Sequence, residues 1–503
     1  MLGSAAGTAG KGVAPPAAAP KPDRFLVILV AIGIVELWLL PLKASFWLDE
    51  TATFWIIKDG LSNLVSRAIY WSGQSPFYYL VAWLALQMGG LQTIVLRMPS
   101  IIAMALAAYW LYKLATRLLD AETAPLAVLV FVCLEQVAFA AGDARPYALG
   151  LCMLTGSAFL LVRWLDEGRL RDAVGYALLA ALTVYAHYLL AIGLVIPAVY
   201  AIRRVLTERR AKLSTLAASF VLAGVLLIPL VPQFLTFYRS RTSHSFSYTP
   251  QFGDLLLATA PPILAVSIAF GFVIAWTFTP QLKTGGAVHK KTLIMLFTWV
   301  LLPPAFCYAI SVITPTKLFL PRYYSSSSPA IALAAGWVIR RFTAGPARRI
   351  LAASVLLAAL ISFGTLRHGD EDWPAAMHAV QSVAGKSNMP VLLPSGFVES
   401  ADPAALEDPK LREVLFAPLN LYPAAGTVIR LPFRLDEQSE RYLESVIATR
   451  LQETTHFLFV GLAQGLSYEP WLRGRLASRG FHEKSLGEFG KIRVYLFSTD
   501  DAL

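Results

Sequence analysis

The sequence predicts a polytopic α-helical membrane protein with a soluble α/β domain at its C-terminal end. Three observations predict this fold class. The 503 residues are 56% hydrophobic and only 15% charged, whereas soluble chains carry nearer a quarter charged residues. Apolar runs long enough to cross a bilayer recur between residues 25 and 366. After residue 366 these runs stop, and short strand-like and helical segments follow one another.

Residues 1–23 are rich in Ala, Gly and Pro, and this composition predicts a disordered cytoplasmic tail. No small-residue cleavage site clearly follows the first apolar run, so we expect a retained signal anchor. The net charge of +11 does not indicate nucleic acid, because the basic residues fall in short clusters between apolar runs. Cys133, Cys152 and Cys307 lie in or beside such runs and show no metal-ligand spacing.

We expect about eleven transmembrane helices between residues 24 and 366. The predicted spans are 25–42, 94–112, 123–140, 146–163, 173–186, 189–203, 214–236, 258–278, 292–312, 323–339 and 350–366. The apolar segment 76–90 has only 15 residues, fewer than the roughly 20 that a spanning helix needs. If it spanned, every later loop would change sides.

The basic residues decide how segment 76–90 is read. If it does not span, most loop Lys and Arg residues face the cytoplasm, as the positive-inside rule requires. The basic residues left outside would then be Arg97, Arg145, Arg239, Arg241, Lys317 and Arg322. The sequence therefore predicts an inner-membrane protein with a cytoplasmic N-terminus, interfacial helices in the outer loop 43–93, and residues 367–503 as a non-cytoplasmic α/β domain.

This topology brings unusual ionisable residues to one face of the membrane. The outer loops after the first, third, fifth and ninth spans hold Asp49 and Glu50, Asp143 and Arg145, His187, and Arg322. Charges at bilayer depth are costly and usually functional. We therefore expect these residues to mark the functional site.

Asp49 and Glu50 follow the first span directly, among the aromatic residues of "SFWLDETATFW". They could be a solvated carboxylate pair in an interfacial loop. Alternatively, desolvation by the aromatic residues makes one of them basic enough to take a proton from an acceptor hydroxyl. Trp is also an ordinary interface anchor, so both interpretations stay open, as does the choice of base.

The remaining charges also have two interpretations each. Asp143 and Arg145 could form an internal ion pair that caps the next span, or Asp143 could orient the acceptor or share a cation with Asp49. Arg322, beside Tyr323, suits a lipid-linked phosphate, but a snorkelling arginine would have the same sequence. His187 is most simply a hydrogen-bonded histidine at a helix end.

Several motifs resemble the membrane glycosyltransferases of the GT-C fold, in the branch of protein O-mannosyltransferases and the aminoarabinose–lipid A transferase. The similar stretches are "LDE", "SPFYYL", "LRMPS", "DARPYAL", "AHY" and "PRYY…SPAIALAAGW". The resemblance covers about 45–190 and, more weakly, 320–337. The family often has His-Pro-Pro where this chain has Gln74-Ser75-Pro76, and often Glu where it has Asp143.

The resemblance implies an enzyme that takes a sugar from a polyprenyl phosphate and transfers it, with inversion, to a lipid, glycan or protein acceptor outside the membrane. It implies Asp49 as the catalytic base, supported by Glu50 and Asp143. By position, Arg97 and Arg322 would hold the lipid phosphate. The other substrate-binding residues implied are Tyr78, Arg145, Tyr147, His187 and Tyr323.

Two other classes use similar charges: a transporter or flippase of lipid-linked glycans, and a polymerase or ligase of surface glycans. A transporter should place ionisable residues near the membrane centre, on broken helices, whereas these residues cluster at one face. No cofactor is certain. A divalent metal is possible, since Asp49, Glu50, Asp143 and His187 could bind one, but no spacing demands it.

The C-terminal domain should contain four strands, at 391–394, 427–433, 456–462 and 491–498. Between them, "WPAAMHAVQSVAG", "DEQSERYLESVIATRLQE" and "YEPWLRGRLASRG" have helical spacing. Alternation of such elements predicts an α/β domain.

Overall fold

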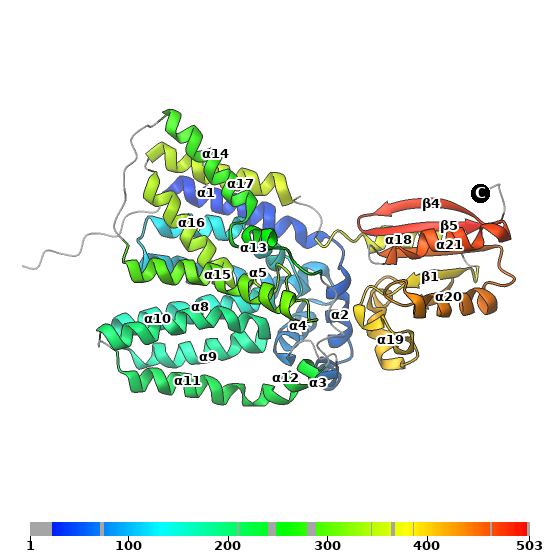
Figure 1. The fold of residues 1–503 in the computed structure, drawn as a ribbon, viewed down its shortest axis with the longest axis horizontal. Coiled ribbons are helices and arrows are strands. Elements are labelled where there is room, and N and C mark those ends of the chain that lie inside the picture. The colour runs from blue at the N-terminus through cyan, green and yellow to red at the C-terminus, as the bar shows by residue number, and fades with distance from the viewer. Residues whose placement is uncertain are drawn as a thin grey trace, which may run out of the picture.

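The structure is a computed structural model that describes residues 23–70, 75–208, 211–239, 248–278, 288–343, 345–363, 368–385, 387–462 and 465–499. Figure 1 shows a helical body on one side and a smaller α/β domain on the other, with α2 and α4 between them. The predicted tail, residues 1–23, lies outside the described residues except for Asp23. The predicted boundary between residues 366 and 367 also lies outside them.

The helical body consists of antiparallel helices of very different length. They are α1 (Arg24–Gly33), which continues through a π-helical turn (Ile34–Leu39) and a 3-10 turn (Leu40–Lys43), then α5 (Thr93–Leu118), α6 (Thr123–Cys133), α7 (Glu135–Ala141), α8 (Tyr147–Glu167), α9 (Leu170–Ala186), α10 (Ile192–Glu208), α11 (Leu213–Leu227), α12 (Val231–Arg239), α13 (Phe252–Thr259), α14 (Pro262–Phe278), α15 (Lys290–Ile313), α16 (Ser328–Phe342) and α17 (Gly345–Phe363).

Among the described residues, seven helices or continuous helical stretches are long and apolar enough to cross a membrane. Two bent pairs, α6 with α7 (72°) and α13 with α14 (58°), raise the number to nine if each pair is one span. The shorter α9 and α16 have 17 and 15 residues. Each predicted span coincides with a helix or a broken helix. The predicted class, a multi-pass membrane protein, is confirmed, while the number eleven stays a prediction.

The first loop of the body folds into three short helices: α2 (Leu48–Ile57), α3 (Leu61–Tyr70) and α4 (Pro76–Gly89). Ser75 caps α4 by accepting a hydrogen bond from the Phe77 amide, Pro76 occupies its first turn, and Gly90 ends it at φ +73°. With 14 residues α4 is too short to span a bilayer. This agrees with the prediction of a non-spanning helix there.

The α/β domain is built on a five-stranded sheet with the order β2-β1-β3-β5-β4. Its strands are β1 (Pro390–Pro394), β2 (Thr427–Leu431), β3 (His456–Leu462), β4 (His482–Phe489) and β5 (Ile492–Ser498), and its helices are α18 (Trp373–Ala384), α19 (Pro409–Leu415), α20 (Glu437–Arg450) and α21 (Tyr468–Leu476). β2, β1 and β3 are parallel, and β5 is antiparallel to both β3 and β4. The four predicted strands and three predicted helices are confirmed, and β4 and α19 were not predicted.

One apolar core joins the domain to the first loop. Phe46, Leu48 and Trp55 of the loop region are buried in the same cluster as Trp373 and Phe416 of the domain. The cluster surrounds the start of α2. The packing of the α/β domain therefore fixes the helix end that carries Asp49 and Glu50.

Candidate active site

The two acidic residues of "LDE" lie in the first turn of α2, which begins at Leu48. Carboxylates are favoured there by the helix dipole and the unpaired amides. Successive residues of a helix point about 100° apart, so Asp49 and Glu50 face different surroundings. The acidic pair therefore lies at a helix N-terminus and not in an interfacial loop.

Glu50 points into the protein and is 1% exposed. Its Oε1 accepts hydrogen bonds from Arg97 Nε (2.8 Å) and from the Ala144 amide (2.7 Å). Its Oε2 accepts from Arg97 Nη2 (2.5 Å) and from the Trp47 amide (3.2 Å). Burial alone would raise the pKa of Glu50, but the charge and hydrogen bonds of Arg97 lower it overall. Glu50 is thus a carboxylate whose ionised form is favoured and whose position is fixed by four hydrogen bonds.

Arg97, in the second turn of α5, is also fully buried. Besides Glu50, its guanidinium donates to the carbonyl oxygens of Pro41, Leu42, Ala44 and Ser45, at 2.8 to 3.2 Å. This geometry ties α5 to the end of α1 and the start of α2. It does not agree with the prediction that Arg97 holds a lipid phosphate, because the guanidinium is enclosed and engaged by protein oxygens.

Asp49 faces the other way and stays partly accessible. Its Oδ2 accepts a hydrogen bond from Arg322 Nη1 at 3.0 Å, and the two side chains are 17% and 22% exposed. Arg322 lies in the turn before α16, with its guanidinium 5.4 Å from the Tyr323 ring centroid and 5.9 Å from that of Trp47. An accessible carboxylate and an accessible cation therefore meet at the rim of the buried cluster.

Asp143 and Arg145 lie between α7 and α8, and no ion pair joins them in the described chain. Asp143 Oδ1 accepts a hydrogen bond from Trp47 Nε1 at 3.0 Å, and no described residue donates one to its buried Oδ2. Burial raises the pKa of Asp143. Arg145 donates to the Asp49 carbonyl (3.3 Å) and to Thr53 Oγ1 (3.4 Å). Both residues therefore hold the start of α2 in place through these hydrogen bonds.

The predicted aromatic residues gather beside these charges. Tyr147 and Tyr323 flank the His187 ring, with centroids 5.0 and 5.8 Å away. His187 is buried, and its Nδ1 has no hydrogen-bond partner among the described residues. Tyr78 is buried and packs edge-on against Tyr79 at 5.9 Å. The structure thus brings the predicted residues together from α2, α4, α5 and the turns before α8, α10 and α16.

One part of the site was not predicted from the sequence: the segment 368–371, which leads into the α/β domain. The His368 ring packs on Phe139 at 4.3 Å, and its Nε2 lies 3.5 Å from Asp143 Oδ1. Gly369 has φ +73°, and an added Cβ there would lie 2.4 Å from Trp47 Cβ. The available signal was "RHGDEDW", a charged stretch containing glycine directly after the last apolar run.

Glu371 completes this segment by capping α2 from outside. Its Oε2 accepts from the Leu48 amide (2.9 Å) and from Trp373 Nε1 (2.8 Å), while its carbonyl oxygen accepts from Ser45 Oγ (2.6 Å). Desolvation raises the pKa of Glu371 to about 7. The segment is held to the β4–β5 turn, since the Lys491 amide donates to the Asp370 carbonyl at 2.6 Å.

One group of residues has atoms close enough to be considered as metal ligands. Glu50, Asp143 and His368, all buried, place one ligand atom each within 4.8 Å of one another. However, both Glu50 oxygens already accept hydrogen bonds from Arg97, whose charge opposes a second cation beside it. Of the atoms that these three residues could offer to a metal, Asp143 Oδ2 and His368 Nε2 have no hydrogen-bond partner among the described residues. This donor set fits a divalent metal poorly.

Comparison with known proteins agrees with the fold. A family model described as "Dolichyl-phosphate-mannose-protein mannosyltransferase" matches residues 73–235, about a third of the chain. The structure of ArnT from Cupriavidus metallidurans in the apo state is similar with a TM-score of 0.54 and 14% identity, over 94% of this chain and 98% of that one. The structure of the same protein bound to undecaprenyl phosphate is similar with a TM-score of 0.52 and 13% identity, over 95% and 98%. A comparison with curated protein sequences found no match.

The likeness to the ArnT structures shows the GT-C fold, and residues 73–235 match the family model of membrane mannosyltransferases. The resemblance predicted from the motifs around the acidic pair is thereby confirmed. The matched residues 73–235 contain Arg97, Asp143, Arg145 and His187. The likeness to ArnT extends over the whole helical body and the α/β domain.

Proposed function

We propose that this protein transfers a sugar from a polyprenyl-phosphate-linked donor to an acceptor hydroxyl on the outer face of the inner membrane. The acceptor oxygen attacks the anomeric carbon from the face opposite the phosphate, so the configuration inverts. The bond from that carbon to the phosphate oxygen breaks, and its electron pair stays on the phosphate. The acceptor proton passes to a carboxylate of the enzyme. Such a step needs a base and a cation within reach of one substrate.

The observation that carries this proposal is the contact between Asp49 and Arg322. It pairs the one partly accessible carboxylate of the cluster with a partly accessible guanidinium, at 3.0 Å. Glu50 is enclosed and held by four hydrogen bonds. We therefore assign Asp49 as the base and Glu50 as the residue that fixes α2. The sequence had left this choice open.

Arg322 is the residue we assign to the donor phosphate. A planar guanidinium binds a phosphate through two parallel hydrogen bonds. In the absence of donor, Arg322 is held by Asp49. When an anionic donor takes over this contact, Asp49 Oδ2 is released from Arg322 and can accept the acceptor proton. The undecaprenyl phosphate in the ArnT structure supports a lipid phosphate as the ligand of this fold.

Arg97 takes a different role from the one expected for it. Its hydrogen bonds to Glu50 and to four carbonyl oxygens make it the brace between α1, α2 and α5. We propose that it positions Asp49 through Glu50 and does not touch the donor. The segment 368–371 would act on the same helix end from the other side, through Glu371 and the packing of Gly369 on Trp47.

The test compares Asp49→Asn with Glu50→Gln, purified in detergent and supplied with lipid-linked donor and acceptor. Asp49→Asn should keep donor binding and fold, because the amide is nearly isosteric, and should lower turnover by ~10²–10⁴. Glu50→Gln should lower thermal stability as well as turnover, because it removes the charge that faces buried Arg97. Asp49→Asn with parental turnover would contradict the proposal.

The same assay separates the alternatives. A flippase moves its substrate between two leaflets and forms no product in detergent, where there are no leaflets. A polymerase or ligase would use the same kind of donor but transfer a preassembled glycan. Product mass therefore distinguishes all three, and transfer of a single sugar is the result we expect.

A further inference from the structure

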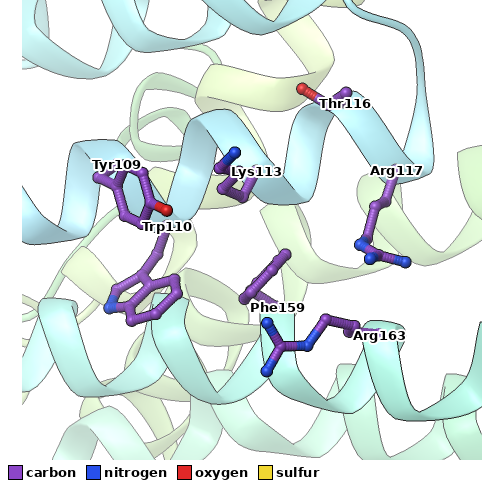
Figure 2. A pocket seen from close by; sticks show the side chains of 7 residues that line it. All are labelled: Tyr109, Trp110, Lys113, Thr116, Arg117, Phe159 and Arg163. Atoms are coloured by element: carbon purple, nitrogen blue, oxygen red, sulfur yellow. The ribbon is translucent and has the colours of Figure 1, made fainter. Parts of the chain in front are cut away.

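A second site lies at the far end of α5 from the acidic cluster. A groove of about 450 Å³ lies between α5 and α8 and is lined by Tyr109, Trp110, Lys113, Thr116, Arg117, Phe159 and Arg163. Figure 2 shows these side chains meeting across one space from the two helices. Arg117 follows Arg97 by twenty residues of continuous helix, a rise of about 30 Å. This matches the thickness of the hydrocarbon core, so the groove faces the opposite leaflet.

The inner wall of the groove is aromatic. Trp110 stacks on Phe159 with ring centroids 5.2 Å apart, and Tyr109 lies 5.3 Å from Trp110. Gly156 makes room for this stack, because an added Cβ would lie 3.1 Å from the Trp110 ring. Trp and Tyr are enriched at the level of lipid headgroups. The position and composition of this wall are thus those of a membrane interface.

The open side of the groove is cationic. Lys113, Arg117 and Arg163 line it, and no lining residue is a carboxylate. Both guanidiniums lie over the Phe159 ring, at 5.8 and 5.0 Å from its centroid. Lys113 lies over Tyr109 at 5.6 Å, and no carboxylate of the described chain forms an ion pair with it. The groove is therefore complementary to an anion.

Nearby carboxylates do not cancel this charge. Asp166 pairs with Arg117 (3.3 Å) but also with Arg204 (2.9 Å). Glu167 pairs with Arg117 and with Arg169. Asp172 accepts a hydrogen bond from Arg163 Nε at 2.9 Å and also pairs with Arg171, while Glu208 pairs with Arg204. These four carboxylates face five arginines and Lys113, so the end of the helix pair keeps a positive excess around the groove.

An apolar stripe leads from the groove along the lipid-facing side of α5. Ile102, Leu106 and Tyr109 are 62%, 42% and 49% exposed, and with Lys113 they recur every three or four residues along one helix face. A soluble anion would make no contact with this apolar stripe. A lipid would place its phosphate among the cations and its acyl chains along Leu106 and Ile102.

We propose that the groove between α5 and α8 binds the phosphate headgroup of an anionic phospholipid from the leaflet opposite the active site. The volume of about 450 Å³ accommodates a phosphoglycerol headgroup with its bound water. Basic pockets between helices at a membrane surface recognise lipid headgroups in this way. The site is separate from the proposed donor site, and it does not depend on the proposed reaction.

The test measures lipid retention. The protein is reconstituted in nanodiscs of phosphatidylcholine with or without phosphatidylglycerol, released into detergent, and weighed with its bound lipids by native mass spectrometry. The parent should retain phosphatidylglycerol in preference to phosphatidylcholine. Lys113→Glu reverses a charge in the groove and should weaken this retention on the order of tenfold to thirtyfold. Lys113→Gln should weaken it about fivefold.

Two controls make the outcome specific. Lys212 is an exposed lysine directly before α11 at the same membrane face, and its side chain makes no capping hydrogen bond. Lys212→Glu therefore changes the net charge equally and should alter retention less than twofold. Leu106→Ser interrupts the apolar stripe and should weaken lipid retention without changing the groove charge. Equal losses in the Lys113 and Lys212 variants would overturn the proposal, as would displacement of the lipid by millimolar inorganic phosphate with no effect of Leu106→Ser. Size-exclusion profiles and circular dichroism verify that each variant is folded.

Discussion

Glu371 offers the sharpest check on how the α/β domain holds the acidic helix. Its carboxylate is 8% exposed and accepts hydrogen bonds from the Leu48 amide and Trp373 Nε1. Desolvation is the main reason that its pKa rises from 4.5 to about 7. The nearby charge of Asp49 acts in the same direction, and Lys491 opposes it. Because the pKa is raised in the folded state, the folded protein binds the proton more tightly than the unfolded chain does.

The sign of the pH dependence follows. Stability linked to Glu371 is fully present below pH 4.5 and is lost progressively as pH rises towards about 7. A shift from 4.5 to about 7 corresponds to about 3 kcal/mol. Glu371→Gln keeps an oxygen acceptor for Leu48 and Trp373 but removes the charge. It should therefore be more stable than the parent at pH 8, by up to about 3 kcal/mol, and similar to it at pH 4.5.

The assay is thermal unfolding of the detergent-solubilised chain between pH 4.5 and 8.5, followed by intrinsic fluorescence. The difference in melting temperature between Glu371→Gln and the parent should grow with pH, to several degrees. Asp372→Asn is the matched control, since this neighbouring carboxylate is exposed and caps α18; it should show no such trend. A constant difference between the Glu371 variant and the parent across this range would refute the buried, desolvated carboxylate.

Four further predictions concern the site and the topology. Arg322→Ala should reduce donor use roughly ten- to a hundredfold, as expected for one charge-assisted contact, and Lys in its place should restore part of it; unchanged donor use would make Arg322 a headgroup anchor. Arg97→Lys should lower the free energy of unfolding by about 3 kcal/mol or more, because one ammonium group cannot make all the hydrogen bonds of the buried guanidinium. A parental melting temperature would contradict the structural role assigned to Arg97. Transfer should survive a chelator, and restoration of lost activity by one divalent metal would show that the donor-set argument is wrong. A cysteine at His289, which is exposed, should be protected from an impermeant label added outside, while positions after Gly369 should react. Ala211 is also expected inside but is buried, so only its labelling from outside is informative, and that result would exclude the eleven-span topology. Ser245, expected outside, lies beyond the described residues.

Much of this organisation could be predicted from the sequence, because hydrophobic runs and basic loops report directly on the membrane. The orientation of the acidic pair could not. Asp49 and Glu50 are chemically similar neighbours, and their separation follows only from α2 beginning at Leu48. The role of Arg97 could not be predicted from the sequence either. Its predicted position near the outer membrane face suited a phosphate, but only the three-dimensional arrangement shows four carbonyl oxygens around it.

The missed elements have different causes. β4 is an edge strand with mostly exposed or half-buried residues, so it lacks the apolar alternation of a buried strand. Glu371 was missed because its partner, the Leu48 amide, is 323 residues away in the chain. Polar contacts at that separation leave no pattern in a single sequence. Similarity to solved structures shows the fold, but it does not identify a hydrogen-bonded pair such as Glu371 and the Leu48 amide.

The charges of the site suggest why Asp143 is buried without a partner for Oδ2. Asp49, Glu50 and Asp143 are matched in number by Arg97, Arg145 and Arg322, so an anionic donor adds negative charge to a balanced cluster. Glu50 cannot relieve this excess, because Arg97 lowers its pKa. Burial raises the pKa of Asp143, and its unpartnered Oδ2 has room for a proton. Burial therefore favours the protonated form of Asp143, whereas Arg97 favours the ionised form of Glu50.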